Sequence, residues 1–265
     1  MWFRKNIILL YILFLFFIVL GGLYLQYYGN TRDVSLDNSF RPPSVQHPGG
    51  TDEVGRDVFQ RTIQGASLSL RIAVLAWSVS LFAGLIAGAV AGYFTNSIAD
   101  IIISALITYA YATPFIIFLI ALLGVLGPGL VNAYLILILF AWAAPARQAR
   151  VIVKGLKTSR YMIAARSFGY SSKEMLAFVI IPQVLKPVLI ASLAVLPEII
   201  ALDAVLAFFG LGVQPPAPSL GKMITDGINY LSVAWWIVFF PVCILIIICI
   251  LIRLSANRLS SVVYE

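Results

Sequence analysis

The stretch IIISALITYAYATPFIIFLIALLGVLGPGLVNAYLILILFAWAAPA, residues 101–146, carries no charged side chain over 46 positions. About 20 apolar residues cross the hydrocarbon core of a bilayer as one helix, so this stretch predicts two membrane-spanning helices. Gly127, Pro128 and Gly129 divide it, because glycine and proline end or turn a helix. The sequence therefore predicts an all-α membrane protein.

More apolar runs lie on both sides of this stretch. Residues 7–25 follow Arg4 and Lys5 and exceed the apolar core of about 7–15 residues in a signal peptide, so they predict an uncleaved first span. Residues 56–66 place apolar side chains on one helical face and predict a short helix on the membrane surface, leading into the second span. The second, fifth and sixth spans are predicted at residues 72–99, 187–209 and 231–252.

The charge distribution predicts an orientation for these spans. The chain is 61% hydrophobic and 11% charged, whereas soluble domains carry about 25% charged residues. With six spans, 12 of the 18 Lys and Arg residues lie on the same side as the termini, and the positive-inside rule assigns that side to the cytoplasm. We expect a multi-pass cell-membrane protein in contact with lipid, with both termini cytoplasmic and no nucleic acid partner.

The predicted spans suggest a division of the chain into two parts. Residues 1–70 hold the first span, an external loop and the surface helix. Residues 71–265 hold a five-helix core with a cytoplasmic loop at residues 147–186.

This cytoplasmic loop predicts two short helices joined by a fixed bend. A helical pattern ends at Gly169, since glycine commonly terminates helices. Ser171 and Glu174 have the spacing of a capping box, which starts a second helix, and Pro182 is expected to disturb that helix. Such a knob suits the transmission of force to a partner; an ordinary interfacial helix pair is the alternative.

The same loop resembles a motif of ABC-importer permeases, E-A-A-x3-G-x9-I-x-L-P, in which Ile163 occupies the glutamate position and Val179 replaces the isoleucine. In that family the loop forms a coupling helix that docks in a groove of the ATP-hydrolysing subunit. The resemblance implies that the residues coupling this chain to an ATPase are Tyr161, Ala164, Ala165, Arg166, Gly169 and Pro182.

Three further segments resemble dipeptide, oligopeptide and nickel permeases. HPGGTDEVGRD at residues 47–57 resembles H-P-x-G-T-D-x-x-G-R-D, and FFGLGVQPPAPS at residues 208–219 resembles F-L-G-L-G-x-x-P-P-x-P-S. AWW at residues 234–236, followed by Phe240 and Pro241, resembles the start of their last helix, whereas residues 253–261 lack the pattern N-L-x-G-D-x-L-R-D. The external signature residues are Gly50, Thr51, Asp52, Gly55, Arg56, Asp57, Gly210, Gly212, Pro215 and Pro216.

The resemblance implies the ABC type I importer permease fold and a function. The chain is expected to be a permease subunit that forms half of the path for peptides delivered by an extracytoplasmic solute-binding protein. A second homologous permease subunit and two ABC ATPase subunits are implied, with ATP and magnesium held by the ATPases and no cofactor on this chain. Nickel or another metal chelate is the alternative cargo, because permeases for both share these signatures.

Two acidic residues lie within the predicted fifth span. A carboxylate inside a span costs roughly 2.5–3.5 kcal/mol, so Asp203 is a candidate pathway or gate residue, with a structural hydrogen bond as the alternative. Glu198 lies five residues earlier, and at 100° per residue the two point about 140° apart. They are therefore not expected to form a catalytic pair, and Glu198 is expected to be supported by packing or to lie near a midplane cavity.

The remaining motifs predict structure rather than chemistry. Asp52, Glu53 and Asp57 lack the spacing of a calcium loop, so we expect a surface turn whose acids cap helices or pair with Arg56 and Arg61. Small residues recur at Gly84, Gly88 and Gly92, a spacing that permits close helix contact within the chain or with a partner.

The chain is not expected to be an enzyme. Gly221 and Lys222 do not complete a Walker A pattern, and His47 is the only histidine. A secondary transporter or channel is a remoter alternative, because it needs ion-coordinating groups in broken helices, often in paired repeats, and no repeat is visible. An intramembrane enzyme ranks last, since nucleophile and metal motifs are missing.

Overall fold

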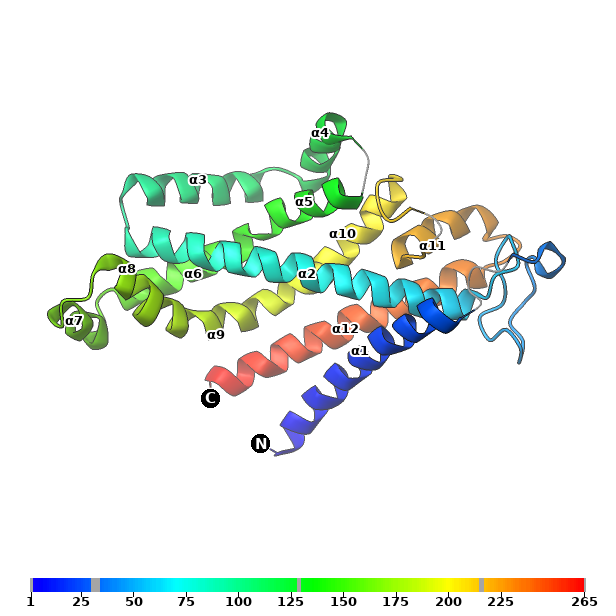
Figure 1. The fold of residues 1–265 in the computed structure, drawn as a ribbon, viewed down its shortest axis with the longest axis horizontal. Helices are drawn as coiled ribbons and strands as arrows, with labels where there is room; N and C mark the ends of the chain where they lie inside the picture. The colour runs from blue at the N-terminus through cyan, green and yellow to red at the C-terminus, as the bar shows by residue number, and fades with distance from the viewer. Residues whose placement is uncertain (1, 30–33, 128–129, 215–216, 265) are drawn as a thin grey trace. The chain divides into compact units, whose positions relative to one another are not determined.

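A computed structural model describes residues 2–29, 34–127, 130–214 and 217–264 (Figure 1). These residues form helices and one isolated β-bridge, with no strand among them, which confirms the all-α prediction. The helices are α1 (Trp2–Tyr28), α2 (Val58–Tyr93), α3 (Ile98–Ala112), α4 (Phe115–Leu126), α5 (Leu130–Ala141), α6 (Ala143–Leu156), α7 (Arg160–Ser167), α8 (Ser172–Glu174), α9 (Ile181–Ser192), α10 (Leu196–Phe208), α11 (Leu220–Gly227) and α12 (Trp236–Tyr264). Shorter helical segments are η1 (Leu36–Asn38), η2 (Met175–Ile180), η3 (Leu193–Val195) and η4 (Ile228–Tyr230).

The apolar helices confirm a multi-pass membrane protein. Five helical segments of the described chain are long and apolar enough to cross a membrane, and the bent pair α3–α4 raises the number to six if it is one span. The five segments are Leu10–Tyr28, Val58–Tyr93, Tyr134–Leu156, Ser172–Phe208 and Trp236–Ser261.

The chain divides into two compact units. The first unit contains the described residues of Met1–Val74, Pro128–Ala133 and Pro197–Arg258. In it, α1 packs against the first half of α2, where Gly22 leaves no room for a side chain beside Ser67 and the Ser67 hydroxyl donates to the Val19 carbonyl at 3.0 Å. A buried cluster joins the starts of α2 and α12 with α11: Val58, Met223, Ala234, Trp236 and Ile237.

The second unit contains Leu75–Gly127, Tyr134–Leu196 and the described residues of Leu259–Glu265. Its core is a buried cluster from α2, α6, α7, η2 and α9: Leu81, Leu85, Ala89, Ala149, Val153, Met162, Met175, Ile180, Val184 and Val188. Gly84, Gly88 and Gly92 face the α6 backbone so closely that a side chain at Gly92 would place its Cβ 2.7 Å from the Arg150 carbonyl oxygen. The glycine series therefore packs within the chain, one of the two predicted alternatives.

Two predicted helix boundaries are wrong, because the helices continue. The expected surface helix at residues 56–66 and the second span are one 36-residue helix, α2. The expected second helix of the cytoplasmic loop and the fifth span are one helical run, Ser172–Phe208. Pro182 does not end this run, but a π-helical segment, η2, directly precedes it, so the expected disturbance takes the form of a local change in helix type.

Other boundaries move as well. The sequence predicted one break within residues 101–146, and the structure adds a 104° bend between α3 and α4, where Pro114 lacks an N–H to continue the helix. At the predicted break, α4 ends at Leu126 and Gly127 has φ +80°, whereas Pro128 and Gly129 lie outside the described residues. The last helix begins at Trp236, five residues later than predicted, and continues to Tyr264.

Candidate functional site

The predicted coupling segment, residues 158–182, which we call the coupling segment, is attached to the second unit through its first helix, α7. Met162 of α7 is fully buried in that unit's core. The Arg166 guanidinium lies over the Tyr93 ring at the end of α2, 5.7 Å from the ring centroid. These contacts fix α7 on the body of the unit.

The bend after α7 has the predicted construction. Gly169 has φ +83°, a conformation that L-residues rarely adopt. The Ser171 amide donates to Glu174 Oε2 at 2.8 Å, and the Glu174 amide donates back to the Ser171 hydroxyl. This capping box starts the next helix and confirms that part of the prediction.

The outer side of the coupling segment is apolar and exposed. Phe168 is 83% exposed, Phe178 72% and Ile163 58%. Ile163, at the position of the family's glutamate, points away from the core, as does Ala164; Ala165 is half-buried. Exposed apolar groups on a segment held to a core are typical of a protein–protein contact.

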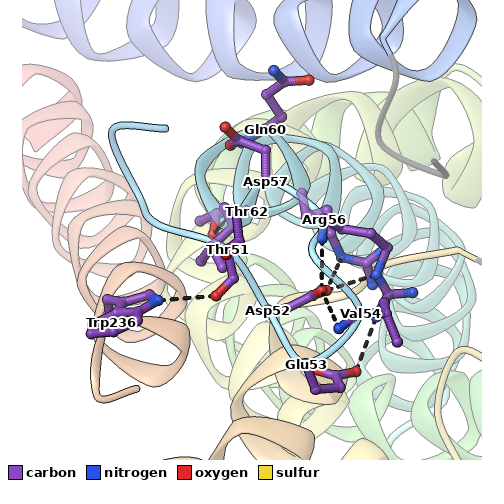
Figure 2. A network of polar contacts seen from close by, with 11 residues as sticks. Thr51, Asp52, Glu53, Val54, Arg56, Asp57, Gln60, Thr62 and Trp236 are labelled. Carbon is purple, nitrogen blue, oxygen red and sulfur yellow. Dashed lines mark hydrogen bonds and ion pairs between the residues drawn. The ribbon is translucent and has the colours of Figure 1, made fainter. Parts of the chain in front are cut away.

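The loop before α2 is a folded network (Figure 2). The Thr51 hydroxyl accepts from the Arg41 amide and donates to the Asn38 carbonyl, while Trp236 Nε1 at the start of α12 donates to the Thr51 carbonyl at 3.1 Å. Gly50 has φ +70°, and a Cβ there would lie 2.5 Å from Trp236 Nε1. The loop is therefore tied to α12.

The acids of this loop stabilise the turn, as predicted. Asp52 Oδ1 accepts from the amides of Val54 and Arg56, and Asp52 Oδ2 accepts from Arg56 Nε at 2.7 Å and lies 3.6 Å from Arg61 Nε. Gly55, at φ +79°, lies within this turn.

Asp57 caps the following helix. Its Oδ1 accepts from the Gln60 amide at the start of α2, and its Oδ2 lies 2.8 Å from His47 Nδ1. Within the described part of the chain, no three His, Cys, Asp or Glu residues are grouped to hold a metal ion. The contacts of Asp57 connect His47 to the start of α2.

The second signature follows α10. Gly210 has φ +73°, and the Gln214 amide nitrogen donates to the carbonyls of Gly210 and Gly212. Ser219 caps α11 by accepting from the Lys222 amide. Pro215 and Pro216 lie outside the described residues.

The two acids of α10 occupy different environments. Asp203 is 3% exposed, and the Ser69 hydroxyl of α2 donates to its Oδ2 at 3.1 Å. Glu198 is exposed. The structure does not bring the two together, in agreement with their helical spacing. The Ser69 contact favours a structural role for Asp203, and a pathway role stays a prediction.

One group of residues was missed by sequence reasoning. Residues 147–156 were assigned to a loop, whereas they belong to α6. Arg150 Nε donates to Asp100 Oδ1 of α3 at 2.6 Å, and the Arg147 guanidinium lies 5.4 Å from the centroid of the Tyr111 ring. A signal existed, since basic residues recur on one face of residues 143–156 while alanine and valine occupy the other, but their partners on α3 lie far away in sequence.

Comparison with known proteins identifies a family of membrane transport components. The model of a family described as "Binding-protein-dependent transport system inner membrane component" matches residues 80–263. The chain is 36% identical over 231 residues to the dipeptide transport system permease protein DppC of Bacillus subtilis (strain 168), covering 87% of this chain and 72% of that protein. It is 34% identical over 207 residues to the oligopeptide transport system permease protein OppC of the same organism, covering 78% and 68%. It is 32% identical over 212 residues to the di/tripeptide transport system permease protein DppC of Pseudomonas aeruginosa (strain UCBPP-PA14), covering 80% and 70%.

Proposed function

The chain belongs to the family of binding-protein-dependent transport system inner membrane components, and from this membership we propose that it is a permease subunit of an ATP-driven peptide importer. It forms half of the translocation path and does not itself hydrolyse ATP. Peptides are favoured over nickel because the three relatives described above are named for dipeptide, di/tripeptide or oligopeptide transport.

The main structural support for this proposal is the way the coupling segment is held, with one side buried and the other exposed. Met162 is buried in the core while Phe168 and Ile163 are exposed, so a force applied to the outer side reaches the body of the unit through a folded contact. The partner at this surface is an ABC ATPase, and two copies serve the complex with ATP and magnesium bound to them. The complex is completed by a second homologous permease and an extracytoplasmic solute-binding protein.

The proposed orientation places both termini and the coupling segment in the cytoplasm. It is supported by the distribution of charge, since 12 of the 18 Lys and Arg residues then lie on the inner side. The folded loop at residues 34–57 then lies outside, on the side from which the binding protein delivers solute.

Reconstitution tests the proposed function. The chain is produced with the permease, ATPases and binding protein encoded beside it, and uptake of a labelled dipeptide into liposomes is measured with ATP or ADP supplied to the ATPases. We expect uptake only with ATP, and no ATP hydrolysis or nucleotide labelling by the isolated chain. Uptake that an ion gradient drives without the ATPases would instead identify a secondary transporter.

A further inference from the structure

Two adjoining pockets lie along α6 in the second unit. One, of about 490 Å³, is lined by residues of α3 and α6, and the other, of about 430 Å³, by residues of α6 and α9 together with Tyr111. Tyr111 and Arg147 line both. Each volume falls within the range of about 300–1,000 Å³ that is typical of small-molecule sites.

Two arginines line these pockets, and only one of them is paired with an acid of the described residues. Arg150 is paired with Asp100. Arg147 has no ion pair with an acid of the described residues, and its guanidinium is held over the face of Tyr111. Its charge therefore remains available to an anionic group of a ligand.

Gln148 adds a hydrogen-bonding group beside this charge. Its Oε1 is shielded from solvent and has no hydrogen-bond partner among the described residues, although the residue lines the pocket. A buried polar atom without a partner costs about 1–3 kcal/mol, so a ligand N–H is favourable at Oε1 once the Gln148 side chain turns this atom toward the pocket. The pocket thus offers a cation and an acceptor on neighbouring residues of one helix.

The residues around the pockets are consistent with a polar path. Arg147 lies on the helical segment Tyr134–Leu156, at the start of the basic residues that the proposed orientation places on the cytoplasmic side, and charged groups on such segments face a protein interior or a wet cavity. On α3, Ser104, Thr108 and Tyr111 face the pocket, while exposed Leu106 and Tyr109 lie on the opposite face. The pocket side is therefore the polar side of this helix.

We propose that Arg147 and Gln148 form a transient site for the carboxyl end of a peptide, with Tyr111 holding the guanidinium. The carboxylate pairs with Arg147, and the N–H of the last peptide group donates to Gln148 Oε1. A linear peptide with a free C-terminus carries both groups unless its last residue is proline, which lacks the N–H, so the site suits a path that accepts many sequences. The proposal rests on the proposed function as a peptide importer.

The test compares a dipeptide with its C-terminal carboxamide in the reconstituted complex. Uptake rates of the two peptides are measured with saturated binding protein. The ratio of free-acid uptake to carboxamide uptake is then compared between the wild-type and variant complexes, all supplied with the same binding protein. Arg147→Gln should lower the ratio of free acid to carboxamide about two- to fivefold, the size of a partly exposed ion pair. Arg147→Lys keeps the charge and should restore most of the ratio.

Lys186→Gln is the matched control. It removes one positive charge from an exposed position of α9 outside both pockets, and should leave the ratio at its wild-type value. An unchanged ratio in Arg147→Gln would overturn the site. An equal loss for both peptides that disappears in vesicles without phosphatidylglycerol would assign the pocket to a lipid phosphate. If the wild-type complex takes up neither peptide, the proposed function itself fails.

A binding measurement makes the test independent of the uptake rate. Thr108, which lines the first pocket, is replaced by cysteine in a chain with Cys243→Ser and Cys249→Ser, and the assembled complex is treated with a thiol reagent. The free dipeptide should slow labelling more than its carboxamide, and Arg147→Gln should remove this difference. Equal protection by both peptides would contradict a carboxylate site.

Discussion

Gly50 allows the loop before α2 to pack closely against the last helix, α12. Its φ of +70° and the 2.5 Å approach of an added Cβ to Trp236 Nε1 both exclude a side chain. Gly50→Ala should destabilise the protein by about 1–3 kcal/mol, the cost of strained backbone in a non-glycine residue, seen as a lower thermal unfolding temperature in detergent. Gly124→Ala on α4 is the control, because no atom lies within 4 Å of an added Cβ. Equal stability of the two variants would mean that the loop is not held as described.

Two substitutions of Asp203 distinguish a structural role of this acid from a role in the transport pathway. Asp203→Asn keeps the size and the ability to accept from Ser69 but removes the charge, whereas Asp203→Leu removes both. If the hydrogen bond at 3.1 Å is what matters, Asn should retain membrane abundance and uptake, and Leu should lose both together. A pathway role predicts a different result, in which uptake by Asp203→Asn falls at wild-type abundance. Normal transport by both variants, measured at matched expression, would refute both roles.

The contact between α2 and α6 depends on small residues at the crossing. A side chain at Gly88 would overlap the Ala146 carbonyl, while Gly155 on α6 has open space around it. Gly88→Ala should therefore destabilise by about 1–3 kcal/mol through overpacking. Gly155→Ala should be neutral or stabilise by up to about 1 kcal/mol through helix propensity. Thermal unfolding of the two purified variants compares them directly, and similar midpoints would rule out close packing at this crossing.

The coupling segment depends on backbone direction rather than packing at its bend. Gly169 has φ +83° and no atom within 4 Å of an added Cβ, so proline, which requires a φ near −65°, should redirect the helix that follows. Gly169→Pro should assemble into the complex and abolish coupling, with ATP hydrolysis no longer accompanied by uptake. Gly169→Asn should keep most uptake, because asparagine tolerates this conformation better than other side chains. Full uptake by the proline variant would remove the docking assignment.

The proposed orientation of the whole chain in the membrane can be tested with reporter fusions. If the inner side carries 12 of the 18 Lys and Arg residues, a fluorescent protein fused to either terminus should fold and emit in the cytoplasm, since the positive-inside rule fixes both ends there. A phosphatase fused after a truncation within residues 34–57 should be active outside. An active phosphatase at the C-terminus would contradict six crossings in this orientation.

Several elements were predictable because local sequence determines them. The apolar runs required membrane helices, the Ser171–Glu174 spacing predicted a capping box that forms, and the acids of residues 52–57 were expected to cap or pair as they do. Helix ends were less accurate. A hydropathy window measures apolar length, whereas α2 begins at Val58, well before the run without charge, because polar residues such as Ser67 and Ser69 are buried against other helices.

The sequence by itself determined the class of protein, the apolar segments and the family, since these depend on composition and on motifs read in order. Only the tertiary structure decided that the glycine series packs inside the chain, that Asp203 meets Ser69 across 134 positions, and that Arg150 pairs with Asp100 across 50. It also left Arg147 beside Tyr111 at a pocket. Such partners are set by how helices pack against one another, and the periodicity of a single helix shows which face is polar but not what that face meets.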